Sequence, residues 1–177
     1  NSQFYEETRF FFAEADVFDV FTYSMTAGDP GTALQNPFSM VITEEMADKY
    51  FGDENPLGKQ LQIQVGPQKA DMQVTGIIEN TPHNSHFHAD FLGSFTTFAA
   101  VAGEDELQDW SSNNYATYLL MPEGYDIARL ESQLDPFINR HLDQGASERT
   151  KLELQALTDI HLYSHLDSEI EANGNIT

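Results

Sequence analysis

The spacing of apolar residues along the chain predicts a series of short strands. Residues 40–42 form an apolar run that is typical of a buried strand. Residues 60–65 alternate glutamines with Leu61, Ile63 and Val65, which indicates a half-buried strand. A second strand at 72–79 then predicts a β-hairpin over 59–79, with Gly76 at a bulge or a close backbone approach. Further strands are expected at residues 9–12, 23–25, 115–121 and 152–157.

Apolar residues at helical spacing predict helices between these strands. Thr43 is expected to cap a helix that ends at Gly52, where glycine can adopt the left-handed conformation. A second helix is expected over 91–101. A third is expected over 126–138, kinked or restarted at Pro136 because proline cannot donate to the helical ladder. Asp16 can cap a single helical turn.

Two segments rich in glycine, proline and asparagine predict turns. The first contains Gly28, Asp29 and Pro30, and the second, residues 53–56, precedes Gly58 and Lys59 at the start of the hairpin. No internal repeat or low-complexity segment is visible. The mixture of strands and helices predicts an α+β fold.

These segments resemble the periplasmic core domain of MacB-type ABC transporter permeases, a family with an FtsX-like membrane part. The matching residues keep their order and spacing from about Asp16 to the C-terminus. They are residues 28–30, 33–34, 37, 42–44, 47, 49–52, 55–59, 74–78, 82, 84–87 and 157–164.

The resemblance implies a division of the fold into two subdomains. Residues 1–36 and 93–177 would form a larger, porter-like β-α-β subdomain, and residues 37–92 a smaller inserted subdomain rich in β-hairpins. It also implies structural roles for nine residues of the matching motifs: Gly28, Asp29 and Pro30 in a turn, Gly52, Pro56, Gly58 and Lys59 at the helix-to-hairpin junction, and His86 and His161 further along.

The resemblance further implies a non-catalytic extracytoplasmic domain of a permease in the inner membrane, with transmembrane helices before Asn1 and after Thr177. ATP would be hydrolysed by a separate cytoplasmic subunit or domain, and no cofactor is expected. In this family such domains work as homo- or heterodimers of permeases and transmit motion. Their partners include a periplasmic adaptor, lipoproteins, peptides or antibiotics, and the sequence leaves open which of them applies here.

Composition sets broad limits on the function. The chain has 177 residues, of which 40% are hydrophobic and 12% aromatic, enough for one ordinary domain or two small subdomains with a core. No run approaches the roughly 18 apolar residues of a membrane span. The absence of cysteine excludes disulfides and thiolate metal sites.

The charge balance is strongly acidic. Asp and Glu number 29 against 8 Lys and Arg, for a net charge of −21. This balance disfavours nucleic acid and anionic lipid as partners, because both bind through clustered Lys and Arg. It favours a salt-adapted organism, with an ordinary acidic domain as the alternative.

Three histidines in one loop are the candidate metal ligands. They are His83, His86 and His88. If the loop were a strand, His86 and His88 would point the same way, and the Asp90 carboxylate could join them. A hydrogen-bonded loop without a metal explains the same residues. The metal hypothesis leads to an alternative function, an extracytoplasmic ligand- or metal-binding sensor domain.

Motifs for enzymatic chemistry are missing. Gly52 and Gly58 are separated by five residues and Gln60 follows Lys59, whereas a phosphate-binding loop needs four intervening residues and a Ser or Thr after the lysine. The chain has no cysteine nucleophile and no Gly-x-Ser-x-Gly. A hydrolase is therefore the least favoured hypothesis.

Overall fold

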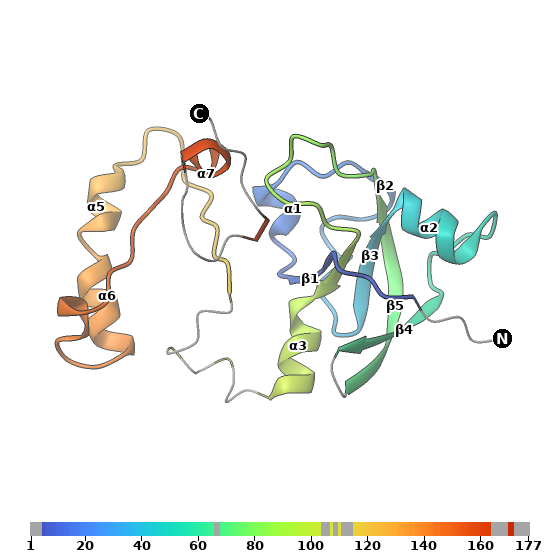
Figure 1. The fold of residues 1–177 in the computed structure, drawn as a ribbon, viewed down its shortest axis with the longest axis horizontal. Coiled ribbons are helices and arrows are strands. Elements are labelled where there is room, and N and C mark those ends of the chain that lie inside the picture. Colours follow the sequence, from blue (N-terminus) through green and yellow to red (C-terminus); the bar gives the residue numbers. More distant parts are fainter. Residues whose placement is uncertain are drawn as a thin grey trace. The chain divides into compact units, whose positions relative to one another are not determined.

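The computed structural model describes residues 5–65, 68–103, 107, 110, 115–163 and 170–171. The chain forms two compact units, residues 1–106 and residues 107–177 (Figure 1). In unit 1 the elements are β1 (Phe10–Ala13), α1 (Val17–Val20), β2 (Met25–Gly28), β3 (Ser39–Thr43), α2 (Glu44–Phe51), β4 (Gln60–Val65), β5 (Gln68–Ile78), β6 (Phe91–Ser94) and α3 (Phe95–Ala102). In unit 2 they are α5 (Ile127–Glu131), α6 (Leu134–His141), the 3₁₀ turn η1 (Ala146–Glu148) and α7 (Leu157–Tyr163).

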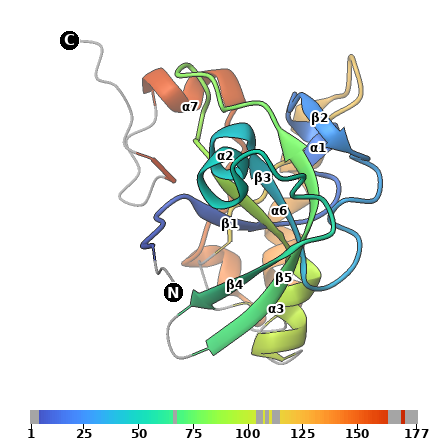
Figure 2. The ribbon, with the colours of Figure 1, turned by 90° about the vertical axis from the view of Figure 1, so that its right-hand side faces the viewer.

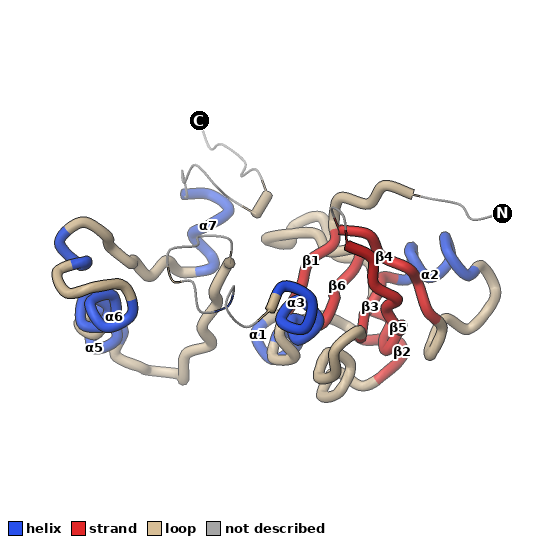
Figure 3. The backbone as a smooth tube through the Cα atoms, turned by 90° about the horizontal axis from the view of Figure 1, so that it is seen from below, coloured by secondary structure: helices blue, strands red, loops and turns tan. Residues whose placement is uncertain are grey.

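Unit 1 is built on one mixed sheet of six strands. The strand order is β1-β6-β3-β5-β2, and β4 pairs with β5. β1 is parallel to β6 and β3 is parallel to β5, whereas the β3–β6, β2–β5 and β4–β5 pairs are antiparallel. The strands lie side by side in the view of Figure 3. The predicted mixture of strands and helices is confirmed for this unit.

The β3–α2 segment supplies the centre of the core, as the apolar run at 40–42 predicted. All five residues of β3 are buried. The Thr43 hydroxyl accepts a hydrogen bond from the Met46 N–H at 3.3 Å, which confirms the predicted helix cap. Gly52 ends the helix with φ 56°. The core cluster consists of Met40, Ile42, Met46, Ala47, Met72, Val74 and Phe91.

The predicted hairpin over 59–79 is confirmed as β4 and β5 (Figure 2). Its register runs from Gln60 opposite Gln73 to Val65 opposite Gln68. Leu61 and Ile63 of β4 pack against the core cluster while its glutamines are exposed. The expected irregularity at Gly76 is also present, because the β3–β5 register shifts there and a Cβ on Gly76 would lie 3.1 Å from Val41 Cγ2.

The helix predicted over 91–101 is only half right. Residues 91–94 form strand β6, and the helix begins at Phe95. A short apolar run fits a buried strand and a buried helix equally well, so periodicity alone cannot separate them. Residues 91–94 form a strand because β6 pairs with β1 on one side and with β3 on the other. The strand predicted at 23–25 is displaced and begins at Met25.

In unit 2 the predicted strand at 115–121 is wrong. The segment is not a strand, and Leu119 and Leu120 are 55% and 67% exposed. The strand predicted at 152–157 is also wrong, since residues 151–156 form no regular element and α7 begins at Leu157. Alternating apolar residues become a strand only where a partner strand pairs with them, and no strand occurs among the described residues of unit 2.

The helix predicted over 126–138 is present as two helices, α5 and α6. The interruption falls at residues 132–133 and not at Pro136. Pro136 lies in the first turn of α6, where backbone N–H groups have no intrahelical acceptor, so the missing N–H costs little there. Ile138 and Ala146 are the buried apolar residues of this unit among those described.

The strands that share the sheet come from residues 10–28 and from residues 39–94. The proposed division into a porter-like part, residues 1–36 and 93–177, and an insert, residues 37–92, stays a prediction. Among the helices of the described residues, none has both the length and the apolar character that crossing a membrane requires.

Candidate functional site

The turn predicted at residues 28–30 leaves β2 in close contact with β5. Gly28 has φ 96°, and a Cβ at this position would lie 2.5 Å from the Thr75 carbonyl oxygen. The Asp29 carboxylate accepts a hydrogen bond from the Gly31 N–H at 2.9 Å, which closes the turn. Glycine is therefore required by contact as well as by conformation.

Three hydroxyl groups anchor the segment that follows this turn. Ser94 and Thr97 are 0% and 1% exposed. Their buried hydroxyl groups need hydrogen-bond partners, and backbone groups provide them. Thr75 Oγ1 donates to the Ala33 carbonyl at 2.7 Å, Ser94 Oγ donates to the Leu34 carbonyl at 2.7 Å, and Thr97 Oγ1 accepts from the Phe38 N–H at 2.6 Å. Residues 33–38 are thereby fixed to β5, β6 and α3.

The second motif, residues 52–59, connects α2 to β4. Asn55 Oδ1 accepts from the Leu57 N–H at 3.1 Å, and the Gly58 N–H donates to the Val74 carbonyl at 2.8 Å. Gly58 has φ 80°, and Pro56 is buried. The junction therefore has a fixed conformation that starts the β4–β5 register.

Lys59, the last residue of that motif, forms an ion pair with Glu54. The hydrogen bond from Lys59 lowers the pKa of the Glu54 carboxyl. The ammonium group thus has a carboxylate partner within the same turn. The structural role expected for Lys59 stays a prediction.

Residues that follow the first turn, residues of the second motif and part of β5 line a shallow cavity of about 340 Å³. It is lined by Thr32, Ala33, Asn36, Leu57, Gly58, Gln73, Val74 and Thr75. These residues offer hydroxyl, amide and backbone groups for hydrogen bonds, and none has an acidic or basic side chain. General acid–base chemistry needs a titratable group, and none of these lining residues supplies one.

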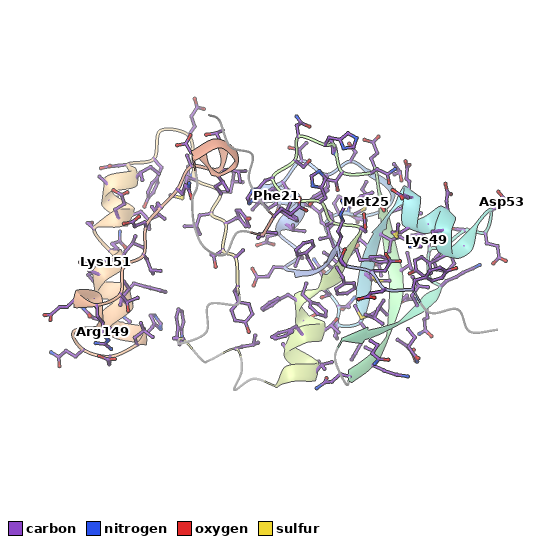
Figure 4. The ribbon with its side chains drawn as sticks, in the orientation of Figure 1. Phe21, Met25, Lys49, Asp53, Arg149 and Lys151 are labelled. Atoms are coloured by element: carbon purple, nitrogen blue, oxygen red, sulfur yellow. The ribbon has the colours of Figure 1, made fainter. Side chains whose placement is uncertain are left out.

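A separate polar cluster joins the chain before β1 to α2. One carboxylate oxygen of Glu7 accepts from Lys49 Nζ at 2.6 Å and from the Tyr50 hydroxyl at 2.6 Å. The Tyr5 and Tyr50 rings meet edge to face with centroids 5.3 Å apart, and Lys49 Nζ lies 5.0 Å from the Tyr5 centroid. Tyr5, Glu7, Lys49 and Tyr50 are called the N-terminal clamp below (Lys49 is labelled in Figure 4).

Charge and burial set the protonation states of the clamp. Burial alone would raise the pKa of Glu7, but the hydrogen bonds from Lys49 and Tyr50 outweigh it and hold the pKa below the ordinary 4.5. The hydrogen bond to Glu7 raises the pKa of Lys49. Burial and the same carboxylate raise the pKa of Tyr50. At neutral pH the clamp is therefore a carboxylate that accepts from an ammonium and a neutral phenol.

The candidate metal ligands His83, His86 and His88 lie between β5 and β6. The His86 ring packs edge to face on Phe87, whose own ring contacts Phe11 and Phe21. Among the described residues, no group of three or more His, Asp or Glu side chains is arranged to hold a metal ion. The structure thus gives the metal hypothesis no support.

His161, another of the nine motif residues, lies in helix α7, residues 157–163. The structural role expected for it stays a prediction.

The sequence did not indicate two sets of long-range hydrogen bonds, those of Glu7 and those of Ser94 and Thr97. Glu7 lies well before its partners in α2, and no local pattern indicates that pairing. Ser94 and Thr97 bind backbone groups 60 and 59 positions earlier in the chain. Their signal is a polar residue inside an apolar run, which indicates a buried hydrogen bond but not its partner.

Comparisons with known proteins address the family. The model of the MacB-like periplasmic core domain matches residues 1–137. A comparison with curated proteins gives no match. Among solved structures, a domain of a permease protein from Porphyromonas gingivalis has a TM-score of 0.62 and 29% identity, over 76% of this chain and 60% of that chain. The periplasmic region of MacB from Actinobacillus actinomycetemcomitans has a TM-score of 0.45 and 14% identity, over 74% and 56%.

The chain thus spans about 60% of the permease domain with which it shares 29% identity. The family match covers all of unit 1, including both motif segments, and extends into α6. Because that match takes in residues 1–137 of 177, the chain belongs to the family of MacB-like periplasmic core domains.

Proposed function

We propose that this domain acts without catalysis in an ABC transporter permease, where it transmits conformational change on the periplasmic side of the inner membrane. The family match over residues 1–137 carries the proposal.

ATP hydrolysis would take place in a separate cytoplasmic subunit or domain. Transmembrane helices before Asn1 and after Thr177 would carry the resulting motion to this domain. Two copies, in a homo- or heterodimer of permeases, would then tilt or separate as rigid bodies. The buried β3 strand supports this behaviour, because Met40, Val41 and Ile42 are 0% exposed and a close-packed core moves as a unit.

The transported or handled molecule would be a lipoprotein, a peptide or an antibiotic, with or without a periplasmic adaptor. The net charge of −21 favours a partner with a basic surface, since complementary charge speeds association. The same acidity fits a salt-adapted organism.

Location is the first test. The chain has no cysteine, so Gln62→Cys, on the exposed polar face of β4, would supply a single thiol in an intact permease from which any other cysteines have been removed. A membrane-impermeant maleimide should label this thiol in spheroplasts. Labelling that appears only after lysis would place the domain in the cytoplasm and refute the proposal. The parent protein without the new thiol is the control.

Catalysis is the second test. The purified 177-residue chain should hydrolyse neither ATP nor a generic ester. Steady turnover that stays with the folded protein through successive purification steps, and disappears on unfolding, would show an enzyme instead.

A further inference from the structure

We propose that the N-terminal clamp joins residues 5–9, helix α2 and the β4–β5 hairpin into one rigid body, so that displacing residues 5–9 also displaces the α2-to-β4 junction. The inference rests on the proposed function in one respect: the transmembrane helix expected before Asn1 is what would displace residues 5–9. The connection of residues 5–9 to α2 and the β4–β5 hairpin, called the joint below, follows from contacts within unit 1.

The first attachment is made by side chains at the C-terminal end of α2. Glu7 receives hydrogen bonds from two consecutive helical residues, Lys49 and Tyr50, each at 2.6 Å. Tyr5 adds a ring contact to Tyr50 and lies within 5.0 Å of the Lys49 ammonium. Hydrogen bonds to a charged group are stronger than neutral ones, and here two of them converge on one oxygen.

The second attachment is made by backbone groups at the N-terminal end of α2. The Arg9 carbonyl accepts from the N–H groups of Asp90 and Phe91, at 3.0 and 3.2 Å. The Asp90 carbonyl in turn accepts from the N–H of Thr43, the helix cap, at 3.1 Å. The chain before β1 is thus connected to both ends of a helix that is about 12 Å long, at 1.5 Å per residue.

α2 itself is seated firmly on the sheet. Met46 and Ala47 are 4% and 8% exposed and belong to the core cluster. The Tyr50 ring, which binds Glu7 through its hydroxyl, also packs edge to face on the buried Phe91. One side chain therefore touches the N-terminal segment and the core together, and the helix cannot shift without moving both.

The path continues from α2 into the hairpin. The junction after Gly52 is short and is fixed by the bond from Gly58 to β5. Leu61 and Ile63 of β4 pack against the same core cluster as Met46. A force applied at residues 5–9 thus reaches β4 through hydrogen bonds and packed side chains, with no freely rotating link among these contacts.

Solvent exposure separates the clamp from an ordinary surface ion pair. Exposed pairs commonly contribute little to stability. The Glu7 side chain is 19% exposed and that of Lys49 34%, whereas the Arg149–Asp143 pair of unit 2 is 59% and 57% exposed. The Glu7 carboxylate is therefore more sheltered than either partner of that exposed pair, and its hydrogen bonds compete with less water.

Hydrogen exchange on the 177-residue chain tests the joint directly. Glu7→Gln should speed amide exchange about five- to tenfold, the effect of losing a charge-assisted hydrogen bond, at residues 5–9, in the last turn of α2 and at residues 57–59. Glu6→Gln is the matched control, because Glu6 is exposed and its change in charge is the same. Tyr50→Phe, which keeps the ring and removes one hydrogen bond, should give a smaller change at the same sites. Faster exchange confined to residues 5–9 would overturn the inference.

A second measurement separates this inference from the proposed function. In the intact permease with Gln62→Cys, the rate of maleimide labelling should depend on ATP, and Glu7→Gln should abolish at least half of that dependence while Glu6→Gln keeps it. If labelling does not respond to ATP even without the Glu7 change, the proposed function fails and the exchange data still decide the joint. If the Glu7→Gln protein responds to ATP as fully as the parent, the joint is refuted.

Discussion

Unit 1 and unit 2 use their apolar residues in different ways. In unit 1 the large apolar side chains of β3 and β6 are almost completely buried, with Ile42 at 0% and Phe91 at 2% exposed, and so are most of those of β5. In unit 2 several large apolar side chains are exposed to solvent, with Leu120 at 67% and Leu152 at 47% exposed. Similar apolar content thus gives a core in one unit and an open surface in the other.

The sheet explains the difference. Apart from the β4–β5 hairpin, the strand pairs of unit 1 join segments that are distant in the sequence, and these pairings bring apolar residues from residues 10–94 into one layer. The described helices of unit 2 are short, of five to eight residues. Short helices bury one stripe each and derive their stability from tertiary packing. Stability should therefore be concentrated in unit 1.

The largest expected effect comes from truncating the core of unit 1. Ile42→Ala should lower the free energy of unfolding by about 2–5 kcal/mol, because it leaves a cavity in a close-packed layer. Leu152→Ala in unit 2 removes a similar volume from an exposed site and should cost less than about 1 kcal/mol. Urea titration checks both, with Trp110, the single tryptophan, reporting on unit 2 and circular dichroism on the whole chain. Equal losses would contradict the contrast between the units.

A glycine at the β2–β5 contact gives the next largest effect. Gly28→Ala should cost about 2–4 kcal/mol, since the new methyl group meets the Thr75 carbonyl oxygen in a backbone conformation that alanine avoids. Gly52→Ala is the control, because Gly52 also has positive φ but open space around it. That change should cost about 1 kcal/mol. Thermal unfolding measures both, and a harmless Gly28→Ala would show that the close contact is absent.

Helix caps compare the two units at a smaller scale. Thr43→Ala should destabilise unit 1 by about 1 kcal/mol, because it removes the hydroxyl that accepts from the Met46 N–H. Asp126 occupies the corresponding position before α5 but makes no side-chain capping bond. Asp126→Ala should change stability by less than about 0.5 kcal/mol. The midpoint of urea unfolding distinguishes these outcomes, and a larger effect for Asp126 would reverse the ranking.

The smallest effect is the pH dependence of the clamp. The pKa of folded Glu7 lies below its ordinary 4.5, so Glu7 stabilises unit 1 above pH 4.5 and this contribution is lost as the pH falls through the lower, folded value. The loss should stay under about 1 kcal/mol at this partly exposed site. Burial raises the pKa of nearby Asp90, which acts in the opposite direction.

Comparison of pH profiles isolates the Glu7 contribution from that of Asp90. The stability of the parent between pH 3 and 6, minus that of Glu7→Gln, should rise with pH, whereas the same difference for Glu6→Gln should be flat. A flat difference for Glu7 would mean that the carboxylate is not held by Lys49 and Tyr50.

Local patterns predicted most of the elements in unit 1. The apolar run at 40–42, the Thr43 cap, the Gly52 stop and the alternation at 60–65 each depend on residues within one or two turns of each other. Backbone conformation responds strongly to such neighbours. The same residues carried the family resemblance, which the match over residues 1–137 confirmed.

The same kinds of pattern gave wrong predictions where the secondary structure depends on pairing with a strand that is distant in the sequence. Residues 91–94 became a strand through pairing with β1 and β3, whereas residues 115–121 alternate cleanly but form no strand. The binding partners of Ser94, Thr97 and Glu7 were equally hidden, since each lies about 40 or more residues away.

The sequence by itself determined the local elements of unit 1, its acidity and its family. Those properties follow from residue type and short-range spacing. Only the tertiary structure decided which apolar segments joined the sheet and how residues 5–9 are fixed to α2. Strand pairing and side-chain hydrogen bonds of this kind depend on groups that meet only after the chain has folded, so no local pattern encodes them.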